Sequence, residues 1–250
     1  IERIKEILET GKLSEMGNFV DAKKEKNDSI NELEEIVGVG RAKALEFYEK
    51  GITSIKQLKE KIKKKEIEVN DKVLLGLKYY GVYKMNIPRK EVTKYYKFME
   101  KVIAYLNKKY ELNESNEYVF EICGSYRREK LVSNDIDVLI SKKKTKTSKT
   151  KSEKHLNRFV NKLKTNLKIN NNKPLLLDDM TDKNITTKYM GFSKLKDNHV
   201  RRIDIRFVPY DSYHSAILYF TGSGDLNKKM RNIAKSKNYK LSEYGLFDEN

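Results

Sequence analysis

The sequence is poor in cysteine and histidine and has no long apolar run, and each shortage excludes a class of protein. The single cysteine, Cys123, rules out an internal disulfide and a cysteine zinc site, so we expect a reducing compartment. The three histidines are scattered without metal-ligand spacing, and we assign them no catalytic role. No apolar run approaches the roughly 20 residues that span a membrane, and no signal peptide opens the chain. We therefore expect no membrane partner.

Acidic residues are the minority charge. Across 250 residues, Lys and Arg number 53 against 36 Asp and Glu, which gives a formal net charge of +17 and a pI near 9.5. A field of this sign attracts polyanions and makes their binding salt-dependent. An anionic membrane would also be attracted, but no basic helix with a strongly apolar face is evident, so nucleic acid is favoured. With 38% hydrophobic residues, the chain can bury a core and is long enough for more than one compact unit.

A pair of aspartates follows a Gly-Ser turn. The segment 124–128 reads Gly-Ser-Tyr-Arg-Arg, and the chain continues into the β-branched, apolar run 136–140. Side chains alternate along a strand, so Asp135 and Asp137 emerge on one face while the apolar residues between them face a core. Two adjacent carboxylates at a buried strand repel each other and lose solvation, so a positive charge is needed between them. A divalent metal is the simplest candidate.

A second strand, 201–207, supplies a third carboxylate. It alternates strictly, with Arg202, Asp204 and Arg206 on one face and apolar residues on the other. If the two strands are neighbours, Asp204 completes a set suited to two Mg²⁺ ions about 3.5–4 Å apart, as used for in-line phosphoryl transfer. The alternative is an Asp-rich strand end that forms surface ion pairs with its arginines. The Gly-Ser turn and the matching strand together disfavour that alternative.

These motifs, with Ile-Pro-Arg at 87–89 and Leu-Tyr-Phe-Thr-Gly-Ser at 218–223, resemble the nucleotidyltransferase signature of family X DNA polymerases. The likeness extends from the first residues to about residue 244 and is specific, because independent motifs occur in order. It implies an α+β fold, in which a nucleotidyltransferase palm with a mixed β-sheet follows an all-helical helix-hairpin-helix DNA-binding subdomain.

The resemblance also implies roles for individual residues. Asp135 and Asp137 would bind both metals, and Asp204 would help to activate the primer 3′-hydroxyl. The family usually has Gly at position 134, where asparagine tolerates left-handed backbone angles; we expect the turn to form but nucleotide affinity to be altered. The implied nucleotide-binding set is Gly124, Ser125, Arg128, Arg89, Asn134, Tyr219, Phe220, Gly222 and Asn227. The implied DNA-binding set is Gly38, Gly40, Arg41, Lys43, Arg202, Lys228 and Arg231.

The segment 30–51 has helix-hairpin-helix character. Apolar positions at helical spacing end in Gly38-Val39-Gly40, and a second helix follows. The glycines let the backbone approach a phosphate, and the second helix offers unpaired N–H groups. An ordinary helical hairpin is the alternative, and Arg41 and Lys43 favour DNA over it. The resemblance adds a monovalent cation held by carbonyls of the turn.

We expect four segments. Residues 1–29 comprise the end of a lyase-like helical domain, with a helix over 1–13 and a polar connector over 21–29, and 30–88 form the helix-hairpin-helix subdomain. Residues 89–209 form the palm, with a flexible basic loop at 141–154, and 210–250 form a nucleotide-binding subdomain that stops short of the family's tail. The family's lyase lysine falls at Arg3, whose guanidinium cannot act as the nucleophile. Since the chain begins with Ile1, we expect a fragment that lacks most of the lyase domain.

The function expected from these features is DNA-directed DNA synthesis of the repair type, which fills short gaps by two-metal transfer of dNMP to a primer 3′-hydroxyl. Mg²⁺ is expected, with Mn²⁺ as an alternative. Template-independent nucleotidyl transfer and a non-catalytic DNA-binding repair scaffold remain open. The expected partners are gapped or primed duplex DNA and dNTP, bound by a monomer in base excision repair or DNA replication. A nucleus and a cytoplasmic viral replication compartment both fit.

Overall fold

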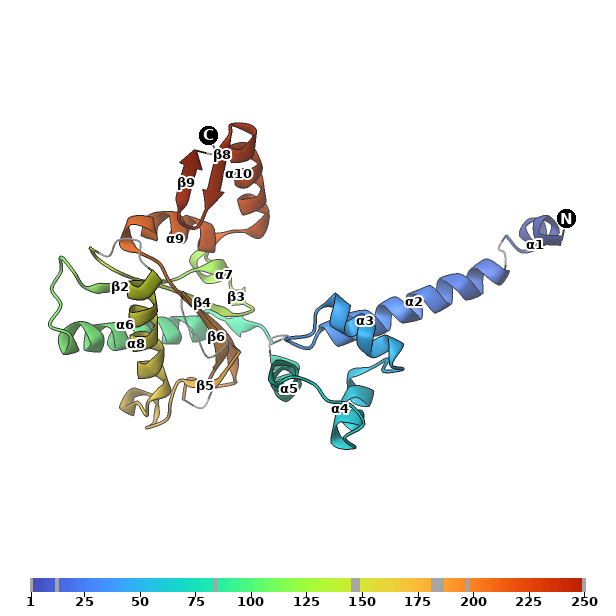
Figure 1. Cartoon of the computed structure of the whole chain (residues 1–250), viewed down its shortest axis with the longest axis horizontal. Coiled ribbons are helices and arrows are strands. Elements are labelled where there is room, and N and C mark those ends of the chain that lie inside the picture. The colour runs from blue at the N-terminus through green and yellow to red at the C-terminus, as the bar shows by residue number, and fades with distance from the viewer. Residues whose placement is uncertain are drawn as a thin grey trace. The chain divides into compact units, whose positions relative to one another are not determined.

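The computed structural model describes residues 2–11, 14–82, 85–144, 149–180, 187–196 and 198–248. The chain divides into two compact units, residues 1–80 and 81–250, and each is described by itself (Figure 1). Among the described helices, none has the length and apolar content needed to cross a bilayer.

The first unit is all helical. One buried apolar cluster holds it together, with Leu33, Ile36 and Phe47 among its fully buried members. Asn70 caps the last helix, because its side chain accepts a hydrogen bond of 3.0 Å from the backbone of Val73. The helices of this unit are α1 (Glu2–Thr10), α2 (Ser14–Glu34), α3 (Arg41–Glu49), α4 (Ile55–Lys63) and α5 (Asp71–Lys78).

The polar connector expected at 21–29 is instead part of helix α2, which runs without interruption from Ser14 to Glu34. The segment is polar and largely exposed, as expected, but the expectation did not include its helical structure. The segment contains neither proline nor glycine, and its Ala, Lys and Glu residues are good helix formers even when exposed to solvent. The expected first helix does end before Gly11, whose φ of +70° suits a helix terminus.

The second unit contains a mixed five-stranded sheet in the order β2-β4-β7-β6-β5, in which only β4 and β7 are parallel neighbours. This arrangement confirms the expected α+β class. The main strands are β2 (Tyr118–Ile122), β4 (Ile136–Lys142), β5 (Leu176–Asp179), β6 (Lys188–Ser193) and β7 (Arg201–Phe207), while β1 (Ile87–Pro88) pairs with β3 (Val132–Ser133) and β8 (Tyr239–Ser242) with β9 (Gly245–Asp248). The helices are α6 (Arg89–Lys109), α7 (Gly124–Arg127), α8 (Lys149–Lys164), α9 (Tyr213–Thr221) and α10 (Gly224–Ser236), with single 3₁₀ turns at Lys168–Asn170 and Tyr210–Ser212.

Each face of the sheet has its own core. Helices α6 and α8 pack on one face, where Ile136, Val138 and Ile205 join the larger cluster. Helix α9 packs near Leu139 on the opposite face, in a smaller cluster. Because side chains alternate along a strand, Asp137 points to the α9 side and away from α6 and α8.

Both ends of the flexible loop expected at 141–154 belong to regular elements. Strand β4 extends to Lys142 and helix α8 already begins at Lys149, while residues 145–148 lie outside the described part of the chain. Lysine and threonine are compatible both with the end of a strand and with the start of a helix. A composition rich in Lys, Thr and Ser therefore did not exclude regular structure at the two ends of this segment.

Candidate active site

Three aspartates converge where β4 and β7 run side by side. The strands pair in parallel with Asp137 opposite Asp204, so the expected neighbourhood of the two strands is confirmed. Asp135 precedes β4 by one residue and shares the face of Asp137. One carboxylate oxygen of each residue lies within 4.8 Å of the others.

Burial makes this cluster electrostatically costly. Loss of solvent, followed by the charges of Asp135 and Asp204, raises the pKa of Asp137 to about 7. Burial also raises the pKa of Asp204. Arg202 partly offsets the repulsion, since its guanidinium donates to Asp135 and, at 3.2 Å, to Oδ2 of Asp204. In this structure, therefore, Arg202 contacts the carboxylates.

The donor set fits a divalent cation. The residues offer only carboxylate oxygens, which are the ligands that Mg²⁺ and Mn²⁺ prefer. Oδ1 of Asp204 is buried and has no hydrogen-bond partner among the described residues. A buried, unsatisfied carboxylate oxygen is costly without a positive partner, and a bound cation would supply one.

The Gly-Ser turn is held directly against this cluster. Directly after strand β2, the backbone N–H of Cys123 donates a 2.8 Å hydrogen bond to the carbonyl of Asp137. Gly124 follows with a φ of +57°, and a Cβ at this position would lie 2.5 Å from Oδ2 of Asp137. Only glycine satisfies both the backbone angle and the close approach.

A pocket of about 390 Å³ opens beside the carboxylates. The structure brings together in its lining every residue of the expected nucleotide-binding set except Arg89, along with Asp135 and Asp137. Asn134 is not among the residues with positive φ, so its tolerance of left-handed angles is not used. Sequence reasoning missed three lining residues, namely Val132, Ser133 and Gly224. The signal for Ser133 was its place between the turn and the aspartates, and its Oγ accepts a 2.8 Å hydrogen bond from Ser125.

Two further contacts shape the pocket on the α9–α10 side. Arg128 donates to the carbonyl of Thr221, which ties α7 to the end of α9. Asn227 donates a 2.7 Å hydrogen bond to the carbonyl of Tyr219, and its own Oδ1 is buried without a partner among the described residues. A polar group in the pocket could satisfy that oxygen.

Arg89 lies outside the pocket lining. Its Nη1 donates a 2.6 Å hydrogen bond to the carbonyl of Tyr126, and its guanidinium lies 4.4 Å from the centre of the Tyr126 ring. The first position of α6 thus places it behind the Gly-Ser turn. Of the residues expected to approach the template, Lys228 lies 3.8 Å from Asp225, and Arg231 lies over the ring of Tyr219 at 5.9 Å.

The two glycines of the hairpin in the first unit differ in their surroundings. Gly38 has a φ of +92° and packs against the backbone of Lys72, while Gly40 caps α3 without a side-chain hydrogen bond. Arg41 forms an ion pair of 3.2 Å with Glu34, and Lys43 one of 2.8 Å with Glu46. Both cations therefore have acidic partners within their own unit.

The fold and the carboxylate cluster together define a nucleotidyltransferase palm, and comparisons with known proteins agree. The chain matches the description "DNA polymerase beta palm" over residues 86–210, "DNA polymerase beta thumb" over 216–250 and "Fingers domain of DNA polymerase lambda" over 31–81. The chain belongs to the family X DNA polymerases, which confirms the resemblance.

Its relatives include two proteins named DNA polymerase lambda. The chain is 33% identical to the one from Arabidopsis thaliana over 250 residues, which covers 98% of this chain and 43% of the relative. It is 28% identical to the one from Rattus norvegicus over 253 residues, which covers 98% and 39%. A shorter match, 32% identical over 63 residues, is to DNA polymerase IV of Saccharomyces cerevisiae. The chain thus spans about two fifths of the length of each of these two DNA polymerase lambda relatives.

Proposed function

We propose that this chain carries a DNA-directed DNA polymerase activity of the repair type, which adds dNMP to the primer 3′-hydroxyl in short gaps. The observation that supports it most is the convergence of Asp135, Asp137 and Asp204 beside a pocket lined by the Gly-Ser turn. Three carboxylates of this kind are suited to metal-assisted phosphoryl transfer.

In the proposed reaction, the chain mainly positions the substrates and neutralises the charge of the phosphates. Two Mg²⁺ or Mn²⁺ ions held by the three aspartates would activate the primer hydroxyl and stabilise charge on the leaving pyrophosphate. Ser125 and Arg128 would hold the β- and γ-phosphates of the dNTP from α7. Arg202 would give up its contacts with the carboxylates when cations replace it.

The sugar and base would be held from α9 and α10. Tyr219, Phe220 and Gly222 would lie along the sugar, and bulk against its 2′-carbon would exclude a hydroxyl there. Asn227 would contact the base, with its unsatisfied Oδ1 and its amide both close to the pocket. Arg89 would need a different rotamer to reach the triphosphate.

We further propose that the first unit grips the DNA backbone through the hairpin at Gly38 and Gly40, with a monovalent cation at the turn, and that the chain acts as a monomer. This hairpin would read no bases, since backbone contacts position a protein without specifying sequence. Lys228 and Arg231 would approach the template strand. The proposed location is the nucleus or a cytoplasmic viral replication compartment.

Extension of a labelled primer across a one-nucleotide gap tests the proposal, with Mg²⁺ present and each dNTP offered separately. Addition of the template-matched nucleotide alone is the expected result. Addition regardless of the template base would refute templated synthesis and indicate template-independent nucleotidyl transfer. Binding of gapped DNA without any addition would favour a non-catalytic scaffold.

The substitution Asp204→Ala should lower extension by at least about 10³-fold, because it removes the carboxylate expected to assist the primer hydroxyl. Gapped-DNA affinity should stay within about twofold, since Asp204 is not expected to contact phosphates. Glu60→Ala removes an exposed carboxylate from α4 and serves as the control, with unchanged extension. Rates and affinities are measured on the same gapped duplex, and retained extension by Asp204→Ala would refute the assignment.

A further inference from the structure

Helix α6 carries a stripe of lysines on its solvent face. The helix spans 21 residues, and its lysines at 90, 94, 97, 101 and 108 recur at spacings of four, three, four and seven. These spacings place them on one side of a helix, over a length of about 27 Å. All five are exposed, and among the described residues their side chains form no ion pair or hydrogen bond. We call this set the α6 lysine stripe.

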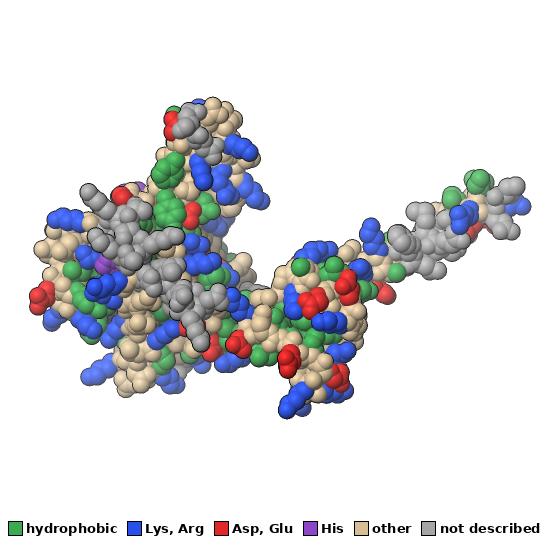
Figure 2. Space-filling model, in the orientation of Figure 1, with side chains coloured by type: hydrophobic (Ala, Val, Ile, Leu, Met, Phe, Trp, Pro, Cys, Tyr) green, Lys and Arg blue, Asp and Glu red, His purple; other side chains and the backbone are tan. Residues whose placement is uncertain are grey.

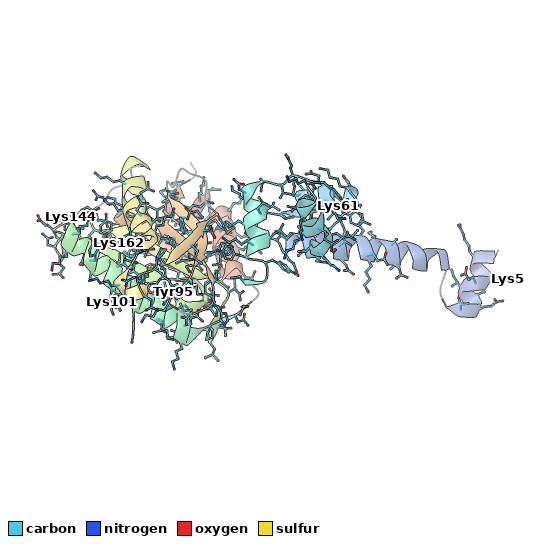
Figure 3. All side chains as sticks on the ribbon, turned by 90° about the horizontal axis from the view of Figure 1, so that it is seen from below. Lys5, Lys61, Tyr95, Lys101, Lys144 and Lys162 are labelled. Carbon is cyan, nitrogen blue, oxygen red and sulfur yellow. The ribbon has the colours of Figure 1, made fainter. Side chains whose placement is uncertain are left out.

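Helix α6 has a buried apolar face and an exposed basic face. Tyr95 and Phe98 are buried in the core, and Figure 3 labels Tyr95 and the outward-facing Lys101 on the same helix. The two glutamates of α6, Glu91 and Glu100, lie off the stripe at helical spacing, and Glu91 is paired with Arg201. The stripe is therefore a surface of one charge sign within α6.

A second segment, distant in sequence, extends this surface. Lys94, Lys97 and Lys101 line a cavity of about 310 Å³ that Lys196 and Asn198 close from the loop between β6 and β7. The floor of the cavity is apolar and consists of Phe98, Ile169 and Leu195. The described lining contains no carboxylate; Asp197, between Lys196 and Asn198 in the sequence, lies outside the described residues.

The position of Lys196 is fixed by the fold. Its backbone N–H donates to the side chain of Asn170, which is 1% exposed and also donates to the carbonyl of Lys194 at 3.2 Å. The φ of Lys196 is +53°, an angle that non-glycine residues rarely adopt. A buried amide thus fixes the backbone of Lys196 at this wall of the cavity.

This surface is separate from the candidate active site. Helix α6 covers the face of the sheet opposite the one to which Asp137 and Asp204 point. Its lysine stripe lies about the width of a helix, roughly 10 Å, beyond that face. A duplex of about 10 base pairs, roughly 34 Å long, that is bound at the aspartates is therefore too short to reach the stripe as well.

We propose that the α6 lysine stripe and Lys196 form a second binding surface for the phosphate backbone of nucleic acid, which engages a segment beyond the one at the catalytic aspartates. From Lys90 to Lys101 the charges recur every ~4.5–6 Å along the helix by its rise, with a longer step of ~10.5 Å to Lys108, and such a row suits a polymer of regularly spaced phosphates. A lipid surface is less suited, because Ala104 and Tyr105 are the only apolar residues exposed between these lysines.

The test compares two gapped duplexes, one with about 10 base pairs and one with about 40, and it measures binding, not synthesis. In the variant Lys94→Gln, Lys97→Gln, Lys101→Gln, affinity for the long duplex should fall at least fivefold. The slope of log K against log[salt] should become shallower by about 2–3, since each lost phosphate contact contributes about 0.9. Affinity for the short duplex should stay within twofold. The readout is independent of whether the chain synthesises DNA.

Two control variants separate position from charge. Lys→Arg at the same three positions keeps the charge and should bind the long duplex like the unmodified chain. Lys56→Gln, Lys63→Gln, Lys64→Gln removes the same charge from exposed sites at α4 and should lose less than twofold. Equal losses in the α4 and α6 variants would overturn the proposal in favour of a net-charge effect. A thermal melt of each variant should match that of the unmodified chain.

A footprint locates the contact directly. Acetylation of Lys94, Lys97 and Lys101, read by mass spectrometry, should be slowed by the long duplex and unaffected by the short one. Unchanged acetylation with the long duplex would overturn the proposal. Binding to phosphatidylserine vesicles that the α6 variant loses, with DNA binding unchanged, would also overturn it and assign the surface to membranes.

Discussion

At the scale of single residues, the candidate site lowers the stability of the folded protein. Asp137 is buried beside two other carboxylates, and the pKa of about 7 reflects that cost. Gly124 is placed so close to this carboxylate that no other residue fits. Such local costs are typical of functional sites, where stability is given up for chemistry.

Replacing Asp137 by asparagine should stabilise the metal-free protein at pH 8. The folded-state pKa of Asp137, about 7, lies above the ordinary value of 3.8, so the folded state binds the proton more tightly. Its contribution to stability is therefore present at low pH and is lost as pH rises from about 4 to 7. The expected gain for Asp137→Asn is about 1–3 kcal/mol at pH 8 and near zero at pH 3.5, where Asp137 is also neutral.

Urea unfolding in EDTA at the two pH values measures this effect. Asp211→Asn, at an exposed carboxylate outside the aspartate cluster, is the comparison and should gain nothing at pH 8. A loss of stability in Asp137→Asn at pH 8 would show that the buried charge is compensated within the fold.

Gly124→Ala should abolish activity and destabilise the chain by about 2–4 kcal/mol, because a positive φ and a contact of 2.5 Å with Asp137 act together. Gly51→Ala measures the cost of the positive φ alone, since Gly51 has a φ of +72° and nothing lies within 4 Å of an added Cβ. We expect that variant to lose only about 1–2 kcal/mol. Thermal melts compare the two, and equal losses would mean that the turn relaxes away from Asp137.

At the scale of elements, helix α6 connects several parts of the second unit. Its inner face fills the larger core, and its first turn holds Glu91, which pairs with Arg201 at the start of β7. The guanidinium of Arg201 is nearly fully buried and forms two bonds to this carboxylate, of 2.9 and 2.8 Å, and one of 3.1 Å to the carbonyl of Met85. This pair fixes the helix to the strand that carries Asp204.

Breaking that pair from one side should be costly. Glu91→Ala leaves the Arg201 guanidinium buried without its carboxylate, and we expect a loss of about 3–5 kcal/mol in unfolding free energy. The double variant Glu91→Leu, Arg201→Met should recover most of that loss, because no unpaired charge remains. Glu46→Ala, which breaks exposed pairs with Lys43 and Lys50, is the control and should cost under about 1 kcal/mol. A small loss in Glu91→Ala would mean that water reaches Arg201.

At the scale of the whole molecule, the chain has two separate principal cores. The core of residues 1–80 and that of residues 81–250 share no member among the buried apolar residues. Lys and Arg side chains are visible on both units in Figure 2, so both carry the charge that attracts nucleic acid.

Residues 1–80 should therefore fold when produced alone. The unit has its own buried cluster around Leu33, Ile36 and Phe47, and a domain of this size can be stable without the rest of the chain. Circular dichroism should show a helical spectrum and a cooperative thermal transition, and Phe47→Ala should remove about 3–5 kcal/mol of stability. A gradual, non-cooperative melt would contradict this prediction.

The sequence by itself determined what is local. Alternation along 136–140 and 201–207 placed the aspartates on one face of each strand, and helical spacing placed the lysines of α6 on one side. Both follow from the periods of strand and helix, which depend only on neighbouring residues. The α+β class and most of the residues that line the pocket were predictable because several motifs occur in order, although Val132, Ser133 and Gly224 were missed and Arg89 lies outside the lining.

Only the tertiary structure decided what depends on distant partners. One example is the parallel register of β4 and β7, which depends on strands far apart in the sequence. Two others are the hydrogen bonds from Arg202 to two aspartates and the contact of Arg89 with Tyr126, because each depends on which groups the fold brings near the arginine. The junction of the α6 lysine stripe with Lys196 joins segments that are about 100 residues apart and that only folding brings together.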